Sequence, residues 1–142
     1  MNSLHHSVII RRIVKDNETA AQTAYRRGDY IACFLLIHSL VESLLRAFLT
    51  KTKRESFNDL IIAYKKYLHE AEQPNLTFVD ELIKFNRRRN RMVHQLWEKG
   101  YTVTNSSLEP ACRAAFTTYG LFIEWLETFD PEITNFGFEY EQ

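Results

Sequence analysis

The chain has 142 residues, of which 45% are hydrophobic and 13% aromatic, and its formal net charge is zero. This length predicts a single domain over 1–142, and the composition suffices for a hydrophobic core. Zero net charge argues against a protein that coats polyanions along its whole surface, although basic residues are dense at 51–54 and 87–91. The two cysteines, Cys33 and Cys112, lack metal-ligand spacing, so we expect buried free thiols in a reducing compartment.

Targeting and membrane patterns are absent from the sequence. The N-terminal residues have no long apolar core after a basic stretch, so we expect no signal peptide. No segment forms the uninterrupted apolar stretch that crosses a bilayer. We therefore expect a cytoplasmic protein without a membrane association.

Hydrophobic periodicity predicts an almost entirely helical chain. Four glycines and three prolines fall between strongly periodic segments. The first helix is expected at about Ser7–Arg27. The second, at about Tyr30–Thr52, is apolar almost all round and should be central. The third begins near Ser56.

The fourth helix is expected from about Phe78 to Glu98. Thr77–Asp80 has the form of a capping box at its start, and Gly100 is the predicted stop. After a polar loop over 100–107, the fifth helix begins near Leu108, with a proline in its first turn, and ends before residue 130.

The connections between these helices are short, which favours antiparallel neighbours. The predicted fold is therefore an all-α, up-and-down bundle of four to five helices. The tail at about 131–142 alternates aromatic with small or acidic residues, and we expect it to be extended, either frayed or packed on a partner.

An arginine falls in the apolar stripe of the predicted fourth helix. At about 100° per residue, Arg89 lies near the centre of the face that carries Leu82, Phe85 and Val93. A charge on such a face is costly unless it is paired. We therefore predict that Arg89 points inward and binds an acidic residue of another helix.

The second helix carries a polar stripe of three residues, His38, Glu42 and Arg46, each one turn apart. These residues could satisfy one another as pairs at i,i+4 or simply face solvent. In the functional interpretation, Glu42 binds the inward Arg89 and His38 lines the same cleft, because a carboxylate fits the planar guanidinium. Both interpretations remain open at this stage.

The segment Arg89-Asn90-x-x-x-His94 resembles the hallmark of the HEPN superfamily, an arginine separated from a histidine by four to six residues, with a polar residue after the arginine. HEPN domains are small helical bundles, so the resemblance extends to roughly 7–129. It implies a metal-independent endoribonuclease of toxin or phage-defence type, acting as a homodimer with a composite site and no cofactor. The alternative is a non-catalytic module that partners a nucleotidyltransferase or an antitoxin.

The resemblance implies a role for each residue of the motif and its surroundings. Arg89 and His94 are the expected catalytic residues, because histidine can transfer protons near neutral pH and arginine can stabilise charge on a phosphate. Asn90, Glu42 and His38 are the expected supporting residues. The outward-facing arginines are either RNA-guiding residues or a solvated basic face: Arg87, Arg88 and Arg91.

The remaining histidines and the two tryptophans are not expected to take part in catalysis. The histidines at 5, 6 and 69 have no partner at metal-ligand spacing, so no metal site is predicted. Trp97 and Trp125 are expected in the core or in a dimer interface.

Overall fold

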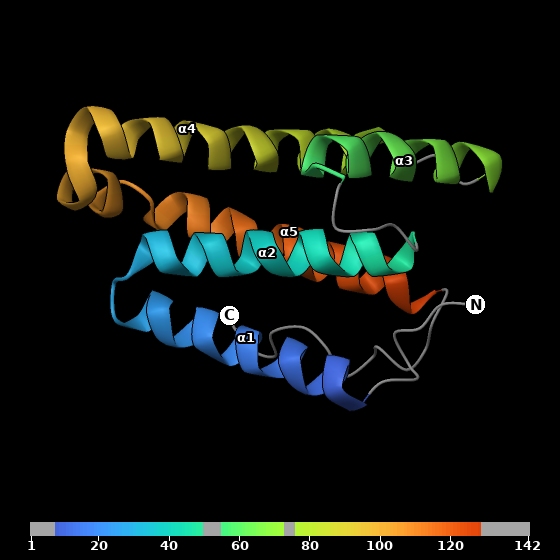
Figure 1. Ribbon diagram of the computed structural model, residues 1–142, viewed down its shortest axis with the longest axis horizontal. Helices are drawn as coiled ribbons and strands as arrows, with labels where there is room; N and C mark the ends of the chain where they lie inside the picture. The colour runs from blue at the N-terminus through green and yellow to red at the C-terminus, as the bar shows by residue number, and fades with distance from the viewer. Residues whose placement is uncertain (1–7, 50–54, 73–75, 129–142) are drawn as a thin grey trace.

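The structure is a computed structural model that describes residues 8–49, 55–72 and 76–128. Over these residues it has no strand, which confirms the all-helical prediction, and it contains five helices: α1 (Val8–Arg26), α2 (Tyr30–Phe48), α3 (Phe57–Glu70), α4 (Leu76–Ser106) and α5 (Glu109–Glu127) (Figure 1). The predicted tail at 131–142, the histidines at 5 and 6 and the basic cluster at 51–54 lie outside the described residues.

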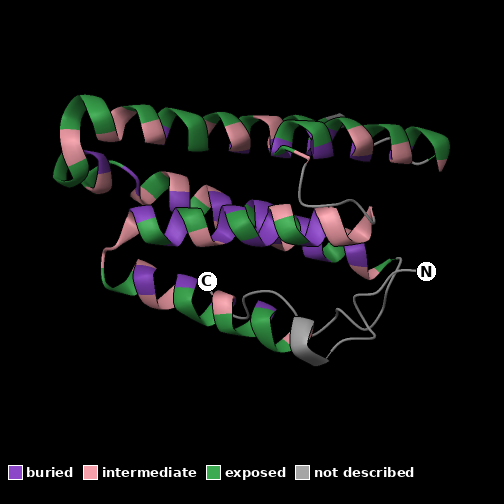
Figure 2. Cartoon of the chain, viewed as in Figure 1, coloured by how far each residue is buried: buried purple, intermediate pink, exposed green. Residues whose placement is uncertain are grey.

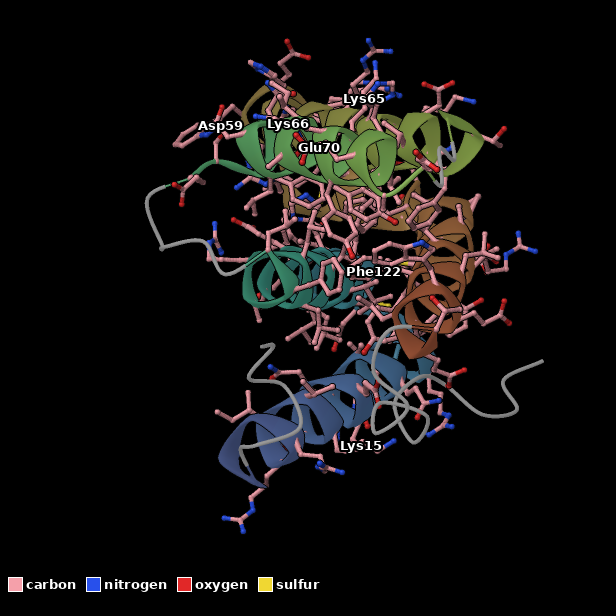
Figure 3. All side chains as sticks on the ribbon, turned by 90° about the vertical axis from the view of Figure 1, so that its right-hand side faces the viewer. Lys15, Asp59, Lys65, Lys66, Glu70 and Phe122 are labelled. Carbon is pink, nitrogen blue, oxygen red and sulfur yellow. The ribbon has the colours of Figure 1, made fainter. Side chains whose placement is uncertain are left out.

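The helices form three layers: α3 and α4 on one side, α2 and α5 in the middle, and α1 on the other side (Figure 1). Figure 3 shows Phe122 of α5 pointing into the interior, whereas Lys65 and Lys66 of α3 lie on the outer surface. The core is therefore built mainly around the middle layer.

The central helix is α2, as predicted, and it contacts each of the other four helices. Figure 2 shows buried residues along most of its length. By length and composition alone this 19-residue helix, with a mean hydropathy of 1.7, could cross a membrane, but a single such helix does not make the chain a membrane protein. Half of that stretch is buried inside the bundle.

The helix directions depart from a simple up-and-down bundle at α3. The helices α1, α2, α4 and α5 alternate in direction, but α3 runs parallel to α2 (Figure 1). Ring contacts join His38 to Phe57 and Phe48 to Tyr67, so the two helices advance together. The up-and-down prediction was wrong here because α3 begins beside the middle of α2 instead of beside its end.

This position of α3 leaves half of α4 uncovered by α3, although Met92 in that half is still buried against the core. The first residue of α3, Phe57, contacts the ring of Phe85 on α4. Because α3 and α4 are antiparallel, the residues of α4 after this point lie beyond the start of α3 (Figure 1). The uncovered half of α4 carries the arginine–histidine motif.

Two helix starts test the predicted capping signals. The start of α3 near Ser56 is confirmed, and a capping box closes it: the amide of Asp59 donates to Ser56 Oγ (3.1 Å), and the amide of Ser56 donates to Asp59 Oδ2 (3.4 Å). The capping box predicted at Thr77–Asp80 was wrong. Because α4 already begins at Leu76, Thr77 lies inside the helix.

Gly100 breaks α4 as predicted, with φ 84° and ψ 173°, a backbone conformation that suits glycine. The chain then resumes helix to Ser106, where a polar loop was predicted. Asn105 in this last segment binds the α1–α2 turn: its Nδ2 donates to the Gly28 carbonyl (2.8 Å), and its Oδ1 accepts from the Ile31 amide (2.9 Å). The end of α4 is thereby fixed against α2.

Candidate functional site

The motif residues Arg89, Asn90 and His94 all lie exposed on the uncovered half of α4. Arg89 donates a hydrogen bond from its guanidinium to Asn90 Oδ1 at 3.2 Å. The motif is therefore accessible to a large substrate.

The predicted inward orientation of Arg89 was wrong, and so was its predicted bond to Glu42. Arg89 is exposed, and Glu42 binds Arg46 on its own helix, with 3.0 Å between Oε2 and the guanidinium nitrogen. The prediction assumed that one face of α4 stays covered along its length, whereas α3 begins beside Phe85. The alternative interpretation of the α2 stripe, as pairs that satisfy one another, is the one that the structure shows.

Asn90 directs the Arg89 side chain around the helix. Five residues place Arg89 and His94 about 140° apart on the helix surface, whereas Asn90 and His94 are about 40° apart. Because the guanidinium binds Asn90, its charge is drawn toward the side that carries His94. The polar residue after the arginine thus has a physical role.

A second polar group lies beneath the motif, where α4 meets α2. His38 of α2 is buried, with its Nε2 at 3.2 Å from Asn86 Oδ1 and its Nδ1 at 4.0 Å from Glu42 Oε1. The imidazole also packs against three aromatic rings: Phe34, Phe57 and Phe85. His38 therefore supports α4 from inside and does not lie on the exposed surface that carries the motif. Sequence reasoning missed Asn86, although it lies one turn before Asn90.

The electrostatics connect this buried group to the motif. Burial lowers the pKa of His38, while the hydrogen bond to Asn86 and the charge of Glu42 oppose that shift. The positive charge of Arg89 is the smallest of these causes and also lowers the pKa. At neutral pH the ring is uncharged.

The three flanking arginines separate into two environments. Arg87 is exposed on the surface of α4. The half-buried Arg88 and the exposed Arg91 line a cavity of about 390 Å³ between α4 and α5. The prediction that all three point outward was therefore wrong for Arg88, and nothing in the sequence of α4 alone indicated the cavity.

The two tryptophans also differ. Trp125 packs against the rings of Phe48 and Tyr64, as expected of a core residue. Trp97, three residues after His94, is 89% exposed, which excludes the core for this residue and leaves the dimer interface as a prediction. Tyr101 is exposed as well. The uncovered half of α4 therefore presents an aromatic surface beside its histidine.

The cysteines are free and buried, as predicted. Sequence reasoning missed their contact: a hydrogen bond with the Cys33 thiol, together with burial, raises the pKa of Cys112. His69 is exposed near the end of α3. Within the described ranges, no three or more His, Cys, Asp or Glu side chains gather as a metal site would require.

Comparison of the chain with protein-family models, curated proteins and solved structures finds no match.

Proposed function

We propose that this chain is a HEPN-like, metal-independent endoribonuclease. The observation that carries the proposal is the exposed His94, five residues after an arginine whose guanidinium is held by Asn90, on the half of α4 that α3 leaves open. This arrangement provides a proton-transfer group and a phosphate-binding cation on a surface that an RNA strand can reach.

The reaction is a transesterification at one phosphodiester. The imidazole of His94 takes the proton of the ribose 2′-OH as that oxygen attacks phosphorus. Arg89 stabilises the extra negative charge on the phosphoryl oxygens. The bond between phosphorus and the 5′-oxygen breaks, and this oxygen takes up a proton from a general acid. The products are a 2′,3′-cyclic phosphate and a free 5′-OH.

The general acid that protonates the 5′-oxygen comes from a second copy of the chain. Among the described residues of α4, His94 is the only histidine, and one imidazole cannot easily serve both oxygens. A two-fold arrangement of α4 against its copy brings two His94 side chains to one site. The exposed Trp97 supports this homodimer, because a large exposed aromatic side chain is typical of an interface. The buried His38 and its partners Asn86 and Glu42 hold α4 in position for it.

The exposed Trp97 equally favours an alternative function, a non-catalytic HEPN-like module that binds an antitoxin or a nucleotidyltransferase. In that case the aromatic surface of α4 binds the other protein, and the histidine has no chemical task. Cleavage separates the two functions, because only the enzyme cuts RNA.

The proposal is tested by incubating the purified full-length chain with total cellular RNA in EDTA, a chelator that removes divalent metals. We expect cleavage by the wild type and by His69→Ala, which removes an exposed histidine on a different helix. We expect none by His94→Ala, whose fold is checked by circular dichroism. Equal cleavage by both variants, or none by the wild type, contradicts the proposal.

A further inference from the structure

The cavity between α4 and α5, whose lining includes Gln95, the residue after His94, has no role in the reaction above. Its α4 side carries Arg88, Arg91 and Gln95. The remaining lining is largely apolar and comes from α4, from α5 and from the residues that precede α5: Met92, Ser107, Leu108, Pro110, Ala111 and Ala114. The cavity therefore combines a cationic rim with apolar walls.

The two arginines that line the cavity are not neutralised by any described residue. Among the described residues, neither Arg88 nor Arg91 forms an ion pair or a hydrogen bond, and no acidic residue lines the cavity. Other arginines of the chain are neutralised: Arg113 pairs with Glu109 at 2.9 Å, and Arg46 pairs with Glu42. Two unpaired guanidinium groups beside one cavity suit an anionic ligand, above all a phosphate.

We propose that this cavity holds one unpaired nucleotide of the RNA, next to the scissile phosphate; the inference rests on the proposed function. The base lies against the apolar walls, the Gln95 amide binds its polar edge, and Arg88 and Arg91 bind the phosphate. A volume of about 390 Å³ falls within the range of sites for small organic ligands.

The helix geometry places this nucleotide beside the reacting group. Arg91 and His94 are three residues apart and hence neighbours on the surface of α4. A strand with one phosphate at Arg91 can therefore place its next phosphate at His94. Because a base inside a duplex cannot turn into the cavity, the substrate class is single-stranded RNA.

Binding is measured with a 2′-O-methyl RNA tetranucleotide, which lacks the attacking hydroxyl and cannot be cleaved by transesterification. In ¹⁵N-labelled full-length protein, we expect it to shift the backbone amide signals of Met92, Ala111 and Ala114. Two variants address the cavity: Arg88→Gln removes a cation at the rim, and Ala114→Leu fills the space with a larger side chain. Arg12→Gln, an exposed arginine of α1, is the matched control.

We expect each cavity variant to weaken binding about tenfold or more, Arg88→Gln because a charge-assisted contact is lost and Ala114→Leu because the base loses its space. We expect the control to bind as the wild type does. If Ala114→Leu fails to fold, Arg88→Gln alone decides. Unchanged affinity in Arg88→Gln, or shifts confined to other helices, overturns the inference. Cleavage without binding in the cavity refutes the inference alone. Binding in the cavity without any cleavage supports the inference and refutes the proposed chemistry.

Discussion

The substitution Asn86→Ala tests the buried contact that joins α4 to α2. Asn86 Oδ1 lies 3.2 Å from Nε2 of His38, whose side chain is only 7% exposed. Removing the partner of a buried polar group costs about 1–3 kcal/mol. Alanine is the better helix former and returns roughly 0.5 kcal/mol. The expected net loss in the free energy of unfolding is about 1–2 kcal/mol.

For a domain of this size, such a loss lowers Tm by roughly 4–8 °C. The matched control is Asn90→Ala on the same helix, which gains the same helix propensity but has an exposed side chain and no buried partner. Thermal unfolding followed by circular dichroism measures both variants. An equal Tm for the two variants refutes the structural role of the His38–Asn86 contact.

Burial lowers the pKa of His38, so the unfolded chain binds a proton at a higher pH than the folded chain, and stability falls as the pH drops below about 6.5. Between about pH 7.5 and about pH 5.5, the midpoint of urea unfolding should fall less for His38→Gln than for His69→Gln, a control that keeps the buried imidazole. Equal falls in the two variants contradict this. Arg89→Lys should reduce kcat/KM for RNA about tenfold or more, because lysine lacks the planar guanidinium that binds two phosphate oxygens at once. If the variant cleaves RNA at the initial rate of the wild type, the guanidinium has no specific role. Trp97→Ser should convert the dimer to a monomer in light scattering, and an unchanged mass removes Trp97 from the interface.

Helix positions could be predicted from the sequence because periodicity and end signals are local. Ser56 begins a helix through its own side chain, and Gly100 breaks one through its positive φ. The direction of α3 is a different kind of property. It depends on contacts such as Phe48 with Tyr67, which periodicity within one helix does not specify.

In the candidate site too, local features could be predicted from the sequence, whereas features that depend on contacts between helices could not. The motif from Arg89 to His94 is local, and its place on a helix could be predicted. The orientation of Arg89 could not, because it depends on where α3 stops covering α4. The contact between Cys33 and Cys112 likewise joins α2 to α5 and leaves no signal in their sequence spacing.

The chemistry of the cut ends tests most directly whether His94 transfers protons in a metal-independent cleavage. A synthetic single-stranded RNA is incubated with the purified chain in EDTA, and the fragments are weighed by mass spectrometry. We predict a 2′,3′-cyclic phosphate on one fragment and a 5′-OH on the other, with no cleavage by His94→Ala. Fragments with 3′-OH and 5′-phosphate ends, a requirement for added divalent metal, or undiminished cleavage by His94→Ala contradict this role of His94.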